Sequence, residues 1–138
     1  GITAKNGDCF VNTGSPHHVQ METQLKNLDV KELGSKIRYG NPYKDEGTNV
    51  NFVKKLSDNR FQVRTYERGV EDETLSCGTG VTAVALAMYV TGETKNKLIV
   101  LETEGGNLQV SFEKNKDTYN NIWLIGPAEQ VFKGSITC

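Results

Sequence analysis

One apolar segment preceded by a glycine-rich turn constrains this chain more than any other feature. The segment runs from Val81 to Val90 and stops at Thr91-Gly92. Valine, leucine, methionine and alanine recur on every side of its helical projection, so it predicts a helix that is buried all round. Its alanines allow neighbouring backbone to approach closely. The remaining residues must therefore supply a shell around this helix.

Cys77 lies directly before the predicted helix, beside Gly78, Thr79 and Gly80. Glycines there let backbone N–H groups point at one spot, and a helix start favours negative charge, so the pKa of Cys77 should fall. Such a group can remove a proton from carbon as a thiolate and return one as a thiol. The N–H groups of Gly78 and Thr79 can hold a carboxylate. A buried structural cysteine is the alternative that this segment leaves open.

Most of the other segments alternate like strands between turn residues. The ranges that predict strands are 8–12, 17–21, 49–53, 61–66, 97–102, 107–112, 121–125 and 130–136. A second helix is expected over 28–37, with Asp29 as its N-cap, while 38–48 and 67–75 are expected to be loops. The predicted fold class is α+β: an antiparallel, barrel-like curled sheet around one buried central helix, with one outer helix, in a single domain of residues 1–138.

Charge and cysteine content exclude several classes of function. Lys and Arg total 16 against 17 Asp and Glu, for a net charge of -1, and no basic stripe suggests a nucleic-acid partner. No apolar run has the length of a membrane span, and no signal peptide is recognisable. Three cysteines without close spacing favour a reducing, cytoplasmic location, and neither a Cys-x-x-Cys pair nor a histidine cluster predicts a metal.

Two further segments contain groups that can handle protons or carboxylates. Ser15-Pro16-His17 ends a predicted strand and would hold an imidazole in a fixed place, although His17 and His18 could simply alternate across the sheet. Glu67 and Arg68 follow another strand. They are either a solvated ion pair or a carboxylate beside a guanidinium that grips a substrate carboxylate. The acidic run 71–73 reads as a solvated loop surface.

Taken together, these segments resemble the carboxyl-terminal half of diaminopimelate epimerase. The matching motifs are Asn12-Thr13-Gly14-Ser15-Pro16-His17, Gly47-Thr48-Asn49-Val50-Asn51-Phe52, and Glu67-Arg68-Gly69 leading to Glu73-Thr74-Leu75-Ser76-Cys77-Gly78-Thr79-Gly80. The last motif is highly specific, and the resemblance covers essentially the whole chain. It implies interconversion of LL- and meso-diaminopimelate, on the route to lysine and peptidoglycan, without pyridoxal phosphate or any other cofactor. It also implies two similar domains with the active site between them.

The resemblance also implies roles for individual residues. Cys77 matches the catalytic cysteine of the second domain, and His17 and Glu67 match polar residues that assist it. The matching substrate-binding positions are Asn49, Arg68, Gly78, Thr79 and Ser15. Ser15 departs from the asparagine that many members have there, and the loop from Arg68 to Glu73 is one residue longer than in many of them.

One motif of the family is absent from this sequence. Inverting a carbon centre needs one group that removes a proton and another that delivers one on the opposite face. The second group in the family is a cysteine in a Cys-Gly-Asn-Gly motif of the first domain, and neither Cys9 nor Cys138 has that context. We therefore expect this chain to be the second domain without the first, to be inactive alone, and to form a homodimer through the uncovered face.

Other functions stay open at this point. The chain could belong to another cofactor-independent racemase or epimerase, such as one that acts on proline. It could be a non-catalytic module that binds amino acids, or an assembly domain in which Cys77 is inert.

Overall fold

A computed structural model describes residues 2–5, 8–75, 78–116, 118–126 and 130–137. Their elements, in chain order, are β1 (Ile2–Lys5), β2 (Asp8–Asn12), β3 (Pro16–Met21), α1 (Val30–Tyr39), β4 (Asn49–Ser57), β5 (Arg60–Glu67), β6 (Asp72–Thr74), α2 (Gly78–Val90), β7 (Leu98–Thr103), β8 (Gly106–Asn115), β9 (Thr118–Ile125) and β10 (Gln130–Thr137).

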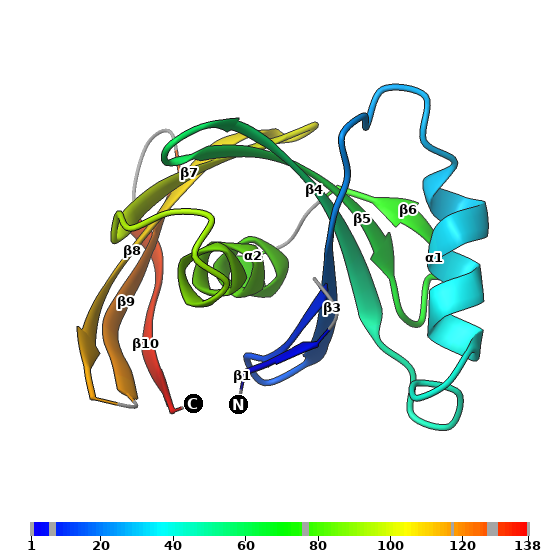
Figure 1. Cartoon of the computed structure of the whole chain (residues 1–138), viewed down its shortest axis with the longest axis horizontal. Coiled ribbons are helices and arrows are strands. Elements are labelled where there is room, and N and C mark those ends of the chain that lie inside the picture. The colour runs from blue at the N-terminus through cyan, green and yellow to red at the C-terminus, as the bar shows by residue number, and fades with distance from the viewer. Residues whose placement is uncertain (1, 6–7, 76–77, 117, 127–129, 138) are drawn as a thin grey trace.

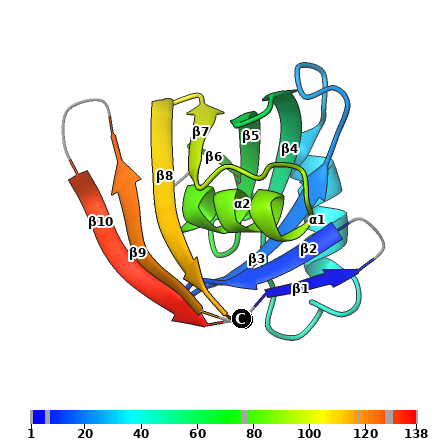
Figure 2. The same ribbon diagram turned by 60° about the vertical axis from the view of Figure 1, so that its left-hand side comes forward.

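All the strands belong to one sheet that curls around α2, with α1 on its outer side (Figure 1). The order is β1-β2-β3-β4-β5-β7-β8-β9-β10, and β6 pairs with β5 off this path. β1 and β10 are the two edges, and they come close at one end in both views (Figures 1 and 2). The predicted fold class, a curled sheet around one central helix with a second helix outside, is confirmed.

The expectation that the sheet is antiparallel throughout is wrong at two places. β3 pairs with β4 in parallel, and β5 pairs with β7 in parallel. A parallel pair needs a long crossover; α1 lies in the first crossover and α2 in the second. Two short strands, β1 and β6, were not expected. β6 lies inside the predicted loop 67–75, where pairing with β5 overrides its polar composition.

Helix α2 fills the concave side of the sheet. Nine consecutive residues, from Gly80 to Met88, are buried. Side chains from both halves of the sheet pack around it, including Val11, Val53, Phe61, Leu101 and Leu124. The sequence prediction of a helix buried on every side is therefore correct.

Helix α1 covers the opposite face of the sheet at β4 and β5. It begins at Val30, two residues later than expected, and the Asp29 carboxylate accepts a hydrogen bond from the Glu32 N–H at 3.0 Å, as predicted for its N-cap. Gly34 lets the helix lie directly on Tyr66, because an added Cβ would be 2.4 Å from the Tyr66 Cβ. β4 is thus covered by α1 on one face and by the α2 core on the other.

Candidate active site

The segments singled out in the sequence meet at one end of the curled sheet. His17 on β3 lies opposite Asn49 on β4, and Val50 lies opposite Tyr66, so the start of β4 adjoins the end of β5. The Thr13 hydroxyl donates to the Thr79 carbonyl at 3.4 Å, which ties the β2–β3 turn to the first turn of α2. Strand pairing and this contact bring together residues that are up to 66 positions apart in the chain.

The structure places seven of the eight predicted site residues at this end. They are Ser15, His17, Asn49, Glu67, Arg68, Gly78 and Thr79. Cys77 lies outside the described residues, and α2 begins at the residue that follows it.

His17 is 1% exposed and lies between two polar side chains. Its Nε2 is 3.1 Å from the Ser15 hydroxyl, and its Nδ1 is 3.2 Å from the Asn51 amide nitrogen. Burial, with a smaller contribution from the positive charge of Arg68, lowers the pKa of His17 from 6.5 to about 4. The imidazole is therefore neutral at pH 7. His18 faces the other way, as the simple alternation across the sheet predicted.

Asn49 uses both ends of its side-chain amide to hold backbone in place. Its Nδ2 donates to the Pro16 carbonyl at 3.0 Å, and its Oδ1 accepts from the Arg68 N–H at 2.8 Å. Asn49 therefore fixes the start of β3 against the residue that follows β5. Sequence reasoning suggested only a substrate contact here; the contacts observed are with the protein's own backbone.

Glu67 and Arg68 point into different surroundings at the end of β5. The Glu67 carboxylate accepts from the Thr74 hydroxyl of β6 at 3.3 Å. The Arg68 guanidinium is exposed and donates to the Glu46 carbonyl at 2.9 Å. Gly47 makes room for the Arg68 stem, since a Cβ there would lie 2.9 Å from Arg68 Cδ and 2.6 Å from Arg38 Nε. Among the described residues, no hydrogen bond or ion pair joins Glu67 to Arg68, and the guanidinium keeps donors free for a ligand anion.

The start of α2 also packs closely against its neighbours. A Cβ on Gly78 would lie 2.6 Å from a methyl of Leu124, so a larger residue between the helix start and β9 would have to displace that methyl. Thr79 is exposed. The backbone of these two residues can thus approach a ligand closely, as anion binding at a helix start requires.

In the acidic run 71–73, Asp72 is exposed, as the sequence suggested, whereas Glu71 and Glu73 are half-buried and paired. Glu73 forms a two-bond ion pair with Arg64, at 2.7 and 2.8 Å. Glu71 accepts from the Tyr66 hydroxyl at 2.5 Å and lies 3.3 Å from Arg38 Nε. Both carboxylates hold the β5–β6 turn, and therefore Arg68, in place.

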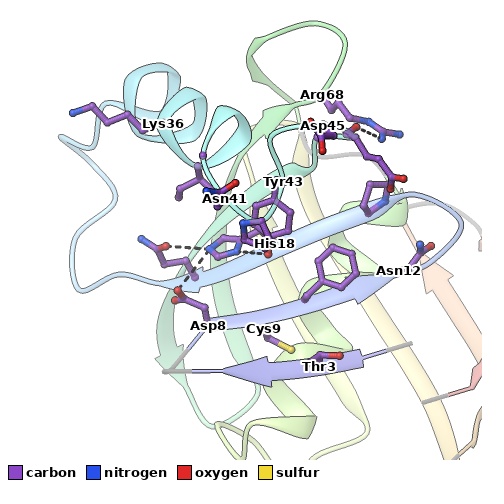
Figure 3. A pocket seen from close by; sticks show the side chains of 18 residues that line it. Thr3, Asp8, Cys9, Asn12, His18, Lys36, Asn41, Tyr43, Asp45 and Arg68 are labelled. Atoms are coloured by element: carbon purple, nitrogen blue, oxygen red, sulfur yellow. Dashed lines mark hydrogen bonds and ion pairs between the residues drawn. The ribbon is translucent and has the colours of Figure 1, made fainter.

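A groove of about 1100 Å³ extends from Arg68 along the outer face of β2 and β3. Figure 3 shows Arg68 and Asn12 at one end and His18, Tyr43 and Asp8 further along. His18 is already hydrogen-bonded there: its ring nitrogens lie 2.9 Å from the Tyr43 hydroxyl and 3.1 Å from the side-chain oxygen Oε1 of Gln20. Arg68 is the residue that this groove shares with the predicted site.

Cys9 cannot serve as a second reactive thiol at this site. It lies in β2 as predicted, is 3% exposed, and packs in the α2 core. Burial raises its pKa to about 11, so it is a thiol at neutral pH.

In the described part of the chain, no three His, Cys, Asp or Glu side chains gather as metal ligands. None of the described helices has the length and apolar character needed to cross a membrane.

Solved structures with the same fold include enzymes of several kinds. A hydroxyproline epimerase from Agrobacterium vitis superposes with a TM-score of 0.59 at 16% identity, over 81% of this chain and 38% of that one. A phenazine biosynthesis protein of the PhzF family from Bacillus anthracis superposes with a TM-score of 0.58 at 17% identity, over 82% of this chain and 34% of that one. Similarity at sequence identities this low supports a shared fold only.

Sequence comparison is more specific. Proteins named diaminopimelate epimerase are similar over nearly all of this chain: 55% identical in Flavobacterium psychrophilum, over 92% of this chain and 50% of that one, and 41% identical in Chlorobaculum tepidum, over 99% and 53%. The chain spans about half the length of these relatives. A family model described as diaminopimelate epimerase matches residues 9–131. This chain therefore belongs to the diaminopimelate epimerase family.

Proposed function

We propose that the protein containing this chain is a cofactor-independent isomerase that interconverts LL- and meso-2,6-diaminopimelate. The observation that carries the proposal is the convergence of Ser15, His17, Asn49 and Arg68 on the start of α2 in a chain of this family. The relatives' names supply the substrate. Lysine and peptidoglycan synthesis is the purpose that we infer from that substrate.

The proposed reaction moves the proton of the α carbon between two groups on opposite faces. Cys77, one residue before α2, is one of them. The positive end of the helix dipole lowers the pKa of a thiol at such a position and brings it into the range for proton transfer near neutral pH. The buried Cys9 is unsuited to be the other. We infer that the opposing group comes from a first domain, since the chain spans only about half of its relatives.

The remaining site residues bind and orient the substrate in this proposal. The N–H groups of Gly78 and Thr79 hold the carboxylate at the reacting carbon, next to Cys77. The Arg68 guanidinium binds the distant carboxylate, and Asn49 holds the Arg68 backbone in position. Glu67 is free to accept from a substrate ammonium group, and neutral His17 does not compete with Cys77 for the proton.

Activity of a two-domain protein tests this proposal. The full-length protein should convert LL- to meso-diaminopimelate and, in D₂O, should incorporate deuterium at the α carbon. Cys77→Ser should abolish both readouts, because a hydroxyl is too weak an acid to share the proton at neutral pH. The 138-residue chain alone should show neither. Activity of the isolated chain, or full activity of Cys77→Ser, would contradict the proposal.

A substrate panel and a binding measurement separate the alternatives. Proline and hydroxyproline turnover by the two-domain protein would assign it to another racemase class. Tight calorimetric binding of diaminopimelate by the isolated chain would favour a binding module. Sedimentation of the chain tests the expected homodimer. The homodimer and the cytoplasmic location both stay predictions.

The pH dependence of Cys77 alkylation tests the activation of the thiol separately. In the variant Cys9→Ser/Cys138→Ser, the rate should rise with a midpoint well below the ordinary thiol pKa of about 8.5. If the midpoint of alkylation lies near the ordinary thiol pKa in the isolated chain but falls once the first domain is added, closure of the cleft activates the thiol. A midpoint near the ordinary thiol pKa with and without the first domain would favour a structural cysteine.

A further inference from the structure

A chain of hydrogen bonds runs from the interior of the sheet to Ser15. The Thr65 hydroxyl donates to Asn51 Oδ1 at 3.0 Å, Asn51 Nδ2 lies 3.2 Å from His17 Nδ1, and His17 Nε2 lies 3.1 Å from Ser15 Oγ. Asn51 is 0% exposed, and Thr65 and His17 are 3% and 1% exposed. Groups buried to this degree must find their partners within the protein, so the direction of each hydrogen bond matters.

The orientation of the Asn51 amide follows from its other neighbours. Its Nδ2 also lies 3.4 Å from the His18 carbonyl, which can only accept a hydrogen bond. With Thr65 donating to the opposite end, the NH₂ group must face His17. His17 Nδ1 is then an acceptor, which leaves the ring proton of the neutral imidazole on Nε2.

This tautomer decides what Ser15 can do. With its proton on Nε2, His17 donates to Ser15 Oγ, and the serine oxygen uses a lone pair to accept. The Ser15 hydroxyl hydrogen is then directed away from His17. In the opposite tautomer, Nε2 would accept from Ser15, and the serine would have no hydrogen to offer a ligand.

We propose that Asn51 is a positioning residue that holds His17 as the Nε2–H tautomer and thereby makes Ser15 a hydrogen-bond donor to a carboxylate of the substrate. The role of Ser15 toward substrate rests on the proposed function, whereas the tautomer does not. An asparagine at position 15 could donate through its own NH₂ group. A serine there needs this network to present a donor in a fixed direction.

Nitrogen-15 NMR of the 138-residue chain at pH 7 tests the tautomer directly. Ring nitrogens with and without a proton differ widely in chemical shift, and the chain has only two histidines, which His18→Gln assigns. We expect His17 Nε2 to carry the proton and Nδ1 to be unprotonated. A proton on Nδ1, or an even mixture of tautomers, overturns the proposal without any variant at position 51.

Asn51→Asp is the sharpest variant, because a carboxylate of the same shape accepts where the amide donates. His17 should then move its proton to Nδ1, and its pKa should rise beside the new negative charge. Thr82→Val is the matched control: Thr82 is buried with no hydrogen-bond partner among the described residues, so a variant of equal shape should leave the His17 spectrum unchanged. An unchanged His17 spectrum in folded Asn51→Asp would refute the proposal.

Kinetics of the two-domain protein test the consequence for Ser15. Asn51→Asp and Ser15→Ala should each lower kcat/KM by about 10- to 100-fold, the effect of losing one hydrogen bond to a charged group. The double variant should be no worse than either single one, because both remove the same donor. Additive losses would overturn the role of Ser15. If the unmodified protein lacked epimerase activity, the proposed function would fail while the NMR result would still decide the tautomer.

Discussion

The side chain of Asn49 binds the backbone of Arg68 although the two residues are 19 positions apart. Its Oδ1 accepts the Arg68 N–H at 2.8 Å, and its Nδ2 donates to Pro16 at 3.0 Å. One amide thus joins the first residue of β4 to the first residue of β3 and to the turn after β5. The position of the exposed Arg68 guanidinium depends on this contact.

Asn49→Ala should lower the free energy of unfolding by about 1 to 3 kcal/mol, since it leaves a partly buried N–H and a carbonyl without their partner. Urea denaturation measures the loss. Asn96→Ala, at an exposed position, is the control and should change stability by less than about 0.5 kcal/mol. In the two-domain protein, Asn49→Ala should also raise KM, because Arg68 is no longer fixed. Equal stability of the two variants would show that the contact contributes nothing.

The lowered pKa of His17 predicts a pH-dependent stability. The folded chain protonates His17 only near pH 4, whereas an unfolded histidine binds its proton near 6.5, so the unfolded state takes up more protons between these values. The free energy of unfolding should therefore fall as pH is lowered from about 6.5 to about 4. The contribution of His17 to this fall is at most about 3 kcal/mol, and it is absent above pH 7.

Urea denaturation of the wild-type chain and of His17→Gln across this pH range isolates the effect, because the carboxyl groups titrate in both. The difference in stability between them should shrink as the pH falls. A difference that stays constant from pH 7 to pH 4 would mean that His17 keeps an ordinary pKa in the folded chain.

The sequence predicts the fold well where one element can be recognised by itself. The α2 segment is apolar on every side and is buried as expected, and Asp29 caps α1 as its position suggests. Strand partners are different, because they depend on contacts between distant residues. Nothing local in β3 or β5 reveals that each has one parallel neighbour.

The same limit applies to the candidate site. His17, Asn49 and Arg68 stand out through their motifs. Asn51 lies in one of these motifs without an assigned role, and Thr65 looks like an ordinary strand residue. A signal for Asn51 does exist: it lies among Val50, Phe52 and Val53 in a strand that is apolar on both sides, as strands covered on both faces are. A polar residue in such a strand must be hydrogen-bonded inside the protein. Its partner, however, emerges only from the parallel register of β3 and β4.

The close packing of α1 on the sheet depends on Gly34. Gly34→Ala places a methyl group 2.4 Å from the Tyr66 Cβ, which is backed by the sheet and cannot move aside. Alanine favours a helix by about 1 kcal/mol over glycine, but forcing an atom into a packed contact costs about 1 to 3 kcal/mol. We expect a net loss of stability in urea denaturation. Lys31→Ala, on the exposed side of α1, is the control and should be close to neutral. A Gly34→Ala chain more stable than wild type would show that α1 shifts freely.

The ion pair between Glu71 and Arg38 is predicted to hold the β5–β6 turn. Glu71 lies 3.3 Å from Arg38 Nε and accepts from the Tyr66 hydroxyl, and the Arg38 side chain is only 15% exposed. Glu71→Gln should cost about 1 to 3 kcal/mol, less than a fully buried pair, because it leaves the Arg38 charge without its partner. Glu32→Gln is the matched control: Glu32 pairs with Lys36 in solvent, and its loss should cost no more than a few tenths of a kcal/mol.

The pH dependence of this effect adds a second test. The hydrogen bond from Tyr66, with smaller contributions from a hydrogen bond of Tyr39 and from the charge of Arg38, lowers the pKa of Glu71 below its ordinary value of 4.5. The stabilisation that Glu71 provides is therefore full above that value and is lost as the pH falls through the lower pKa of the folded state. The stability of wild type and of Glu71→Gln should differ at pH 7 and converge in acid. A double-mutant cycle with Arg38→Gln should give a coupling energy at pH 7. Additive losses would mean that the Glu71 and Arg38 side chains do not interact, so that the Tyr66 hydroxyl and the Glu73–Arg64 ion pair hold the turn without them.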